Sequence, residues 1–109
     1  MKHMMDDINA HYKSLLLFPD YSSTGLWCEC GISISDPLEK TNIPYELIEL
    51  VDCWNLLWEH MSMYNKSINV EIVEKKIISV GRILEERISE YVPCTLIEES
   101  CKLNIREWE

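Results

Sequence analysis

The sequence is short of basic residues and contains no long apolar run. It holds 10 lysines and arginines against 19 aspartates and glutamates, which gives a formal net charge of −9. A chain this acidic repels the phosphates of nucleic acids and of anionic membranes. No apolar stretch approaches the roughly 18 residues that a membrane-spanning helix needs. We therefore expect neither a nucleic acid nor a membrane as a partner.

Glycine and histidine are equally scarce, which removes the familiar catalytic motifs. The 3 glycines stand apart from one another, so the sequence has no glycine-rich phosphate loop. No serine lies in a GxSxG elbow. His3, His11 and His60 have no group in the sequence pattern that would orient them as catalytic bases. The sequence predicts that the protein is not an enzyme and needs no cofactor.

The 5 cysteines lack the paired spacing of a metal site or of a disulfide framework. Their number is odd, and Cys28 and Cys30 form a CxC rather than the CxxC of zinc knuckles and thioredoxin-like sites. The N-terminal residues lack the apolar core and the cleavage site of a signal peptide. We expect a cytoplasmic protein in which all the thiols are free and no metal is bound.

The segment richest in large apolar residues is Pro44–Met61, where we predict the central helix. Apolar residues recur there at spacings of three and four, which places them in one stripe along a helix. Two of them are tryptophans four positions apart, and they make the largest apolar contribution of any segment. The stripe comprises Leu47, Val51, Trp54, Trp58 and Met61, with Leu50 and Leu57 on one side and Ile48 on the other.

A second amphipathic helix is predicted over Val70–Tyr91, with Asn69 as its N-cap and Pro93 beyond its end. Gly81 lies at the edge of its apolar stripe. Because a glycine inside a helix costs about 1 kcal/mol relative to alanine, we expect another element to approach closely there. The stripe comprises Val70, Val73, Ile77, Val80, Leu84, Ile88 and Tyr91.

Strands are predicted on either side of the helices. Tyr12–Phe18 is apolar on both faces, as in the central strand of a sheet. Cys94–Glu98 is a second strand, and Lys102–Trp108 is a further strand or a docked tail. Ile32 and Ile34 alternate with serines, as in a short edge strand, and one helical turn fits the loop that follows.

The expected architecture is a single α+β domain over residues 1–109. Two long one-sided helices must bury their stripes, and the predicted strands provide a sheet for them to cover. We therefore expect two layers, with two antiparallel helices packed on a small sheet. Residues 1–11 have no clear period, and we expect them to be poorly ordered.

Acidic side chains outside the buried stripe are the candidates for binding a partner. The central segment carries four carboxylates and no lysine or arginine. Aromatic residues beside carboxylates on loops also suit a protein-binding patch. An acidic face can instead serve only to keep a protein in solution, and Tyr21 and Trp27 can instead cap the core. The candidate contacts are Asp20, Tyr21, Glu29, Glu46, Glu49, Asp52 and Glu59.

The order of several short motifs resembles that of a known protein family. P-D-Y is followed by G-L-W, by a helix with E-L-I and two tryptophans, and by a helix with G-R. This order, over residues 12–98, resembles small bacterial immunity proteins of polymorphic toxin systems, including contact-dependent growth inhibition. The family has acidic residues where this chain has Cys28 and Val80, so no binding role is carried over to these. The matching residues are Pro19, Asp20, Tyr21, Gly25, Leu26, Trp27, Gly31, Glu46, Leu47, Ile48, Trp54, Trp58, Glu59, Gly81 and Arg82.

The resemblance implies a protein without enzyme activity that binds one toxin in the cytoplasm and blocks it. Toxins of such systems are often nucleases with basic substrate clefts, and an acidic protein can be steered to such a cleft and cover it. We expect a monomer in a 1:1 complex with a basic nuclease domain. The alternative is a cytoplasmic adaptor or regulatory module that binds some other protein and has no toxin partner.

Overall fold

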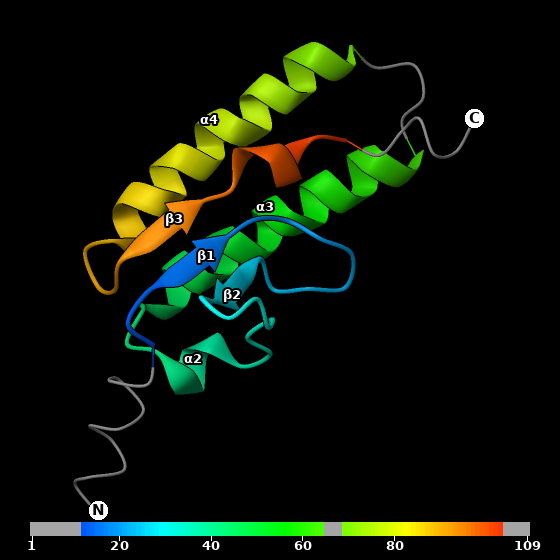
Figure 1. Ribbon diagram of the computed structural model, residues 1–109. Helices are drawn as coiled ribbons and strands as arrows, with labels where there is room; N and C mark the ends of the chain where they lie inside the picture. Colours follow the sequence, from blue (N-terminus) through cyan, green and yellow to red (C-terminus); the bar gives the residue numbers. More distant parts are fainter. Residues whose placement is uncertain (1–11, 65–68, 104–109) are drawn as a thin grey trace, which may run out of the picture.

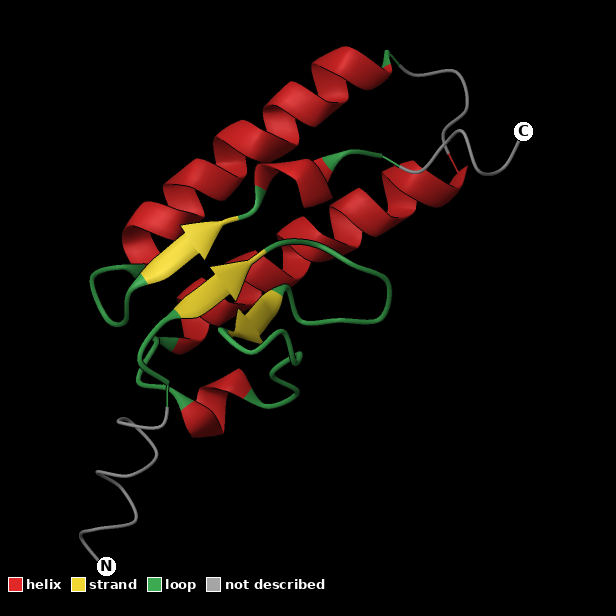
Figure 2. Cartoon of the chain, viewed as in Figure 1, coloured by secondary structure: helices red, strands yellow, loops and turns green. Residues whose placement is uncertain are grey.

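The computed structural model describes residues 12–64 and 69–103 and has an α+β fold (Figure 1). A small sheet forms one layer, and two long antiparallel helices packed against it form the other, as predicted (Figure 2). The predicted disorder of residues 1–11 and most of the predicted segment Lys102–Trp108 lie outside the described residues. The elements are β1 (Leu15–Leu17), β2 (Leu26–Cys28), α2 (Pro37–Lys40), α3 (Tyr45–Tyr64), α4 (Val70–Ile88), β3 (Cys94–Leu96) and the 3-10 helix η1 (Glu98–Cys101).

The sheet has the strand order β2-β1-β3, so the first strand is central, as predicted. β1 is antiparallel to β2 and parallel to β3, and Leu17 lies opposite Leu26 on one side and Leu96 on the other. The strand predicted around Ile32 and Ile34 is wrong. Only an isolated bridge between Trp27 and Ser33 forms there, because the chain turns sharply through the glycine at position 31, whose φ is +89°.

The two faces of the sheet have different environments. Leu15 and Leu17 point into the core and are fully buried, whereas Leu16 is only half-buried on the opposite face. Trp27 lies on that opposite face and stacks on Phe18, with ring centroids 4.4 Å apart. Its indole Nε1–H donates to the carbonyl oxygen of Phe18 at 3.0 Å. The alternative in which Trp27 caps the core is therefore wrong, because the ring lies on the face away from the helices.

The tryptophan stripe of α3 forms the centre of the core, as predicted, together with Leu47 and Val51. The indole Nε1–H of Trp54 donates to the carbonyl oxygen of Ile77 at 2.9 Å, so α3 and α4 are joined by a polar contact inside the core. The indole of Trp58 donates to the carbonyl oxygen of Lys102 at 3.1 Å. Each buried N–H therefore has a partner, which removes the main cost of burying an indole.

The predicted widening of the α3 stripe is wrong on one side. Leu50 and Leu57 are 58% and 48% exposed, although Ile48 on the other side does pack against the core. The reason is that α4 and the sheet both approach α3 from the side of the tryptophans. No element among the described residues covers the side that carries the two leucines.

Helix α4 begins as predicted, because the side chain of Asn69 accepts the N–H of Ile72 at 3.2 Å. It ends at Ile88, before the predicted end at Tyr91, and the exposed side chains of Val80 and Tyr91 show that the predicted stripe is too wide. The close approach predicted at the buried glycine of this helix is confirmed. A methyl group there would lie 3.0 Å from both Leu96 Cδ1 and Trp54 Cζ2.

The prediction of five free thiols is wrong at the CxC motif. Cys28 and Cys30 form a disulfide across the turn that follows β2, and Cys53, Cys94 and Cys101 are free. Two cysteines separated by one residue come close enough to be joined when the backbone turns between them, which the motif spacing alone did not indicate. Within residues 12–64 and 69–103, none of the helices has the length and apolar character needed to cross a membrane.

Candidate functional site

A cleft of about 220 Å³ lies between α2 and the first turns of α3. It brings Glu49 and Asp52, two of the predicted contacts, to one place together with Asp36. Asp36 was not among the predicted contacts, because its position beside α3 depends on how the preceding loop folds back. The lining residues are Thr24, Asp36, Pro37, Leu38, Tyr45, Ile48, Glu49 and Asp52.

Local hydrogen bonds fix the α2 side of this acidic cleft. Pro37 is the first residue of α2, where a missing N–H costs nothing, and its ring is buried. The hydroxyl and the N–H of Thr41 both donate to the carbonyl oxygen of Pro37, at 2.6 and 3.0 Å, and end the helix after one turn. The hydroxyl of Thr24 donates to the carbonyl oxygen of Ile34 at 2.7 Å and holds the loop that leads to Asp36.

The cleft combines an apolar wall with three carboxylate residues among those that line it. Leu38 and Ile48 supply the wall, and the Tyr45 hydroxyl donates to Glu49 on the rim. This hydrogen bond and the charge of Glu49 raise the pKa of Tyr45. A lysine or arginine side chain has a matching structure, because its stem is apolar and its charged head pairs with carboxylates.

The loop after β1 lies along the same side of α3, and the buried Asn55 holds it there. The Asn55 Oδ1 accepts the N–H of Asp20 at 2.9 Å and the hydroxyl of Ser23 at 3.1 Å. Its Nδ2 donates to the carbonyl oxygens of the same two residues, at 3.0 and 3.1 Å. The apolar periodicity of the sequence did not identify Asn55 as a site residue. The signal that would have found it is a polar residue inside an apolar stripe.

Three more of the predicted contacts belong to this loop or hold it. The Glu59 carboxylate accepts the N–H of Ser22 at 2.8 Å, and Ser22 has a positive φ of 54°. The Tyr21 ring is half-buried against Trp58, with centroids 5.0 Å apart. Asp20 is exposed and accepts the N–H of Tyr21 at 2.8 Å. Glu59 therefore orders the loop that presents Asp20 and Tyr21, and its contact with a partner stays a prediction.

The structure separates the last two predicted contacts from this group. Glu29 is exposed in the turn that the disulfide spans, and it accepts the hydroxyl of Ser14 at 2.9 Å. Glu46 is exposed in the first turn of α3, on the side that carries Leu50 and Leu57. It faces away from the cleft, because helix positions 46, 50 and 57 share one side whereas 52 and 59 share another.

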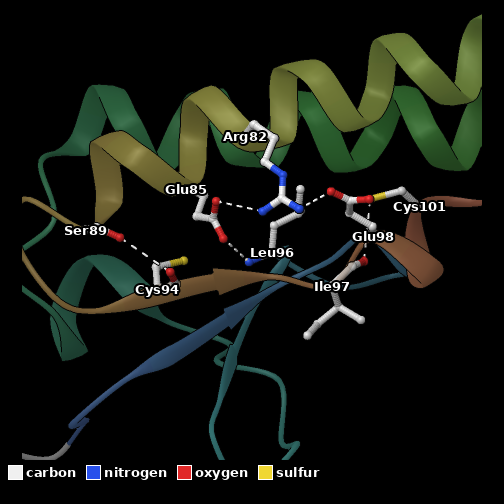
Figure 3. Close-up of polar contacts among 8 residues, drawn as sticks. All are labelled: Arg82, Glu85, Ser89, Cys94, Leu96, Ile97, Glu98 and Cys101. Carbon is white, nitrogen blue, oxygen red and sulfur yellow. Dashed lines mark hydrogen bonds and ion pairs between the residues drawn. The ribbon is translucent and has the colours of Figure 1, made fainter.

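An ion-pair network on the opposite helix is structural (Figure 3). Arg82 of α4 donates hydrogen bonds to Glu85, at 3.0 Å, and to Glu98 of η1. These hydrogen bonds raise the pKa of Arg82, and the one to Glu85 has the larger effect. The second oxygen of Glu85 accepts the N–H of Leu96 at 2.6 Å. The network ties α4 to β3 and η1, so Arg82 stabilises this connection instead of being available to a partner.

The two thiols beside this network are poor nucleophiles. Burial, and then the charge of Glu85, raises the pKa of Cys94 to about 12. Burial, and then the charge of Glu98, raises the pKa of Cys101 to about 11, and its Sγ lies 3.7 Å from the carbonyl oxygen of Ile97 (Figure 3). Because the thiolate is the reactive form, both remain protonated and inert near neutral pH.

Comparisons with protein-family models, with curated proteins and with solved structures find no match for this chain. The acidic cleft is therefore interpreted from its own geometry and charge. Within the described part of the chain, its carboxylates do not form a group that could hold a metal ion.

Proposed function

We propose that the protein is an immunity protein that binds and neutralises a cognate bacterial toxin domain, a nuclease with a basic substrate cleft. The observation that carries this proposal is the acidic cleft, which Asp36, Glu49 and Asp52 line together with apolar residues. The net charge of −9 and the resemblance in motif order support the same class of partner. In this proposal one toxin domain binds each chain, and inhibition needs no catalysis and no cofactor.

A lysine or arginine of the toxin would enter the cleft, with its stem against Leu38 and its charged head between Glu49 and Asp52. Asp20 and Tyr21, on the ordered loop further along α3, would extend the contact along the same side of the helix. The toxin would then lose access to its substrate phosphates, since its basic groups would be paired with carboxylates. Long-range attraction between opposite charges would also speed the encounter.

The test begins with affinity capture from the source cells and identification of the partner by mass spectrometry, followed by binding measurements with the purified partner. The charge reversal Glu49→Lys with Asp52→Lys should weaken binding by about a hundredfold or more, because paired interface charges are left facing like charges. The matched control is Glu86→Lys with Glu99→Lys, which makes the same change in net charge at exposed positions outside the cleft.

Two results would contradict the proposal. One is equal affinity of the cleft and control variants, and the other is a partner whose toxic activity is unaffected by saturating amounts of the protein. A captured partner that is not a toxin, but whose binding still depends on Glu49 and Asp52, would favour the alternative function of an adaptor or regulatory module. That alternative uses the same cleft, since the cleft fits a basic side chain whatever protein carries it.

A further inference from the structure

An apolar groove runs along the seam between α3 and α4, on the side turned away from the sheet. Its volume is about 420 Å³, and Trp54 and Ile77 lie at its floor. The two exposed leucines of α3 are part of its walls, as is the exposed Val80 of α4. The walls are formed by Leu50, Cys53, Leu57 and Met61 from α3 and by Val73, Lys76 and Val80 from α4. The groove is separate from the acidic cleft, which lies on another side of α3.

The side of α3 and α4 that carries the groove has a residue spacing that is typical of helices that pack on further helices. On α3, positions 46, 50, 53 and 57 are spaced by four, three and four residues. On α4, positions 73, 76, 80, 83 and 87 are spaced by three, four, three and four. Such spacing gives each helix a second stripe that points out of the molecule, in addition to the stripe that forms the core. Two identical helix pairs can therefore pack face to face, with the outward stripes of one pair against those of the other.

The charges at one end of the groove are complementary to each other. Trp54 contacts α4 at Ile77 and Gly81, which fixes the level at which the two antiparallel helices lie side by side. Since each residue advances both helices by about 1.5 Å, Glu46 of α3 and Arg87 of α4 lie at one level, beyond the end of the groove. Glu46 forms no ion pair within the described residues, and Arg87 has only an exposed pair with Glu90 at 3.9 Å.

We propose that two copies of the chain associate through this groove, with α3 of each copy lying over α4 of the other. A twofold axis parallel to the helices gives this arrangement and leaves residues at the same level opposite each other. Leu57 of each copy then packs against α4 of the other, and Glu46 of each copy lies over Arg87 of the other. The helix with the Glu46 carboxylate meets the helix with the Arg87 guanidinium twice, so the charges at this end of the face are complementary in the dimer.

The size of the face agrees with a weak dimer. Two helices of about 20 residues cover roughly 30 Å by 20 Å, or about 600 Å² per copy. The total of about 1,200 Å² lies at the lower limit of stable, specific interfaces, so we expect a dissociation constant in the micromolar range. The dimer leaves the acidic cleft of each copy open. The proposed dimer can therefore be right or wrong independently of the proposed function.

The experiment is sedimentation velocity of the purified full chain from submicromolar to submillimolar concentration, without any partner. We expect a shift from monomer to dimer with rising concentration. Leu57→Lys should raise the dissociation constant by more than about tenfold, because it places a positive charge beside Lys76 of the other copy twice per dimer. The matched control is Leu56→Lys, an equally exposed leucine of the same helix that does not line the groove, and it should leave the dissociation constant unchanged.

A charge exchange tests the arrangement of the two copies. Glu46→Arg alone and Arg87→Glu alone should each weaken the dimer, because each brings like charges together, and the double variant should restore it. Circular dichroism and denaturant unfolding check that these surface variants remain folded. A chain that is monomeric at every concentration overturns the proposal, and so does an equal effect of Leu56→Lys and Leu57→Lys. Dimerisation without rescue in the double variant overturns the proposed arrangement of α3 over α4.

Discussion

Asn55 contributes more to the organisation of the binding side than any of the acidic residues near it. Its amide makes all four of its contacts with the loop after β1, two as acceptor and two as donor. A buried polar group is tolerated only when it is fully hydrogen-bonded, and here the bonding also orders a loop that has few apolar anchors of its own. The position of Asp20 is therefore set from within the core.

Replacement of this amide should destabilise the protein measurably. We expect Asn55→Ala to lower the free energy of unfolding by about 2–3 kcal/mol, because it leaves buried groups of the loop unpaired. Urea unfolding measures the loss, and hydrogen exchange should show faster exchange of the Asp20 amide. Asn42→Ala, at an exposed position, is the control and should change stability little. A loss below about 0.5 kcal/mol would mean that water replaces the amide without cost.

At the level of the elements, the position of α4 depends on a glycine, because a residue without a side chain lets other elements come close. Gly81 lets the helix approach Leu96 of β3 and Trp54 of α3 at the same point, which closes the core between the two layers. Alanine is the better helix former by about 1 kcal/mol, so a glycine here is favoured by packing and not by helix propensity. The effect of substitution therefore shows which of the two contributions is larger.

We expect packing to dominate. Gly81→Ala should lower the free energy of unfolding by about 1 kcal/mol, since overpacking costs about 1–3 kcal/mol and the gain in propensity offsets part of it. Chemical denaturation measures the change. Ser79→Ala, at an exposed position of the same helix, gains propensity without a new contact and should be neutral or slightly stabilising. An increase in stability for Gly81→Ala would show that the neighbouring side chains move aside freely.

The long helices could be predicted from the sequence because large apolar residues repeat at the helical period over many turns. The width of a buried stripe could not, because it depends on the side from which other elements approach, and so Leu50 and Val80 were wrongly assigned to the core. The strand β2 was not predicted, because it is only three residues long and contains Cys28, so it shows no alternation of apolar and polar residues. In the candidate site, helix geometry predicts that Glu49 and Asp52 lie on one side of α3. Asp36 could not be predicted, because the folding of a loop brings it to the cleft.

At the scale of the whole molecule, the two binding faces have different chemistry. The acidic cleft and the adjoining loop present carboxylates, so association there should weaken as salt screens the charges. The groove between the helices is mainly apolar, so dimerisation should persist at salt concentrations that abolish binding in the cleft. Salt dependence thus separates the two kinds of association without any mutation.

The stability of the whole chain should fall in alkaline solution because of two thiols. Burial raises the pKa of Cys94 to about 12 and of Cys101 to about 11, from an ordinary value of 9.0. Below the ordinary value the thiols are neutral in both states, and stability is unaffected. Above it the unfolded chain loses protons first, so the unfolding free energy falls by at most about 1.4 kcal/mol per pH unit for each thiol until the folded-state pKa is reached.

Urea unfolding between neutral pH and about pH 11, a range that spans the ordinary thiol pKa, tests how the unfolding free energy depends on pH. The double variant Cys94→Ala with Cys101→Ala should show a flatter decline than the wild type, although it starts from a lower stability. The variant Cys53→Ala, which alters an exposed thiol, should keep the wild-type slope. Parallel curves for the double variant and the wild type would exclude the two thiols as the cause.

The parallel pairing of β1 with β3 also determines how the molecule resists a mechanical load. The chain enters the sheet through β1 and leaves it through β3, and the two strands run in the same direction. Hydrogen bonds from Leu15 to Pro93 and from Ile97 to Leu17 join them at both ends. Tension applied through the two ends of the chain therefore shears all these bonds at once instead of opening them one by one. The smallest layer of the fold is thus its mechanical clamp.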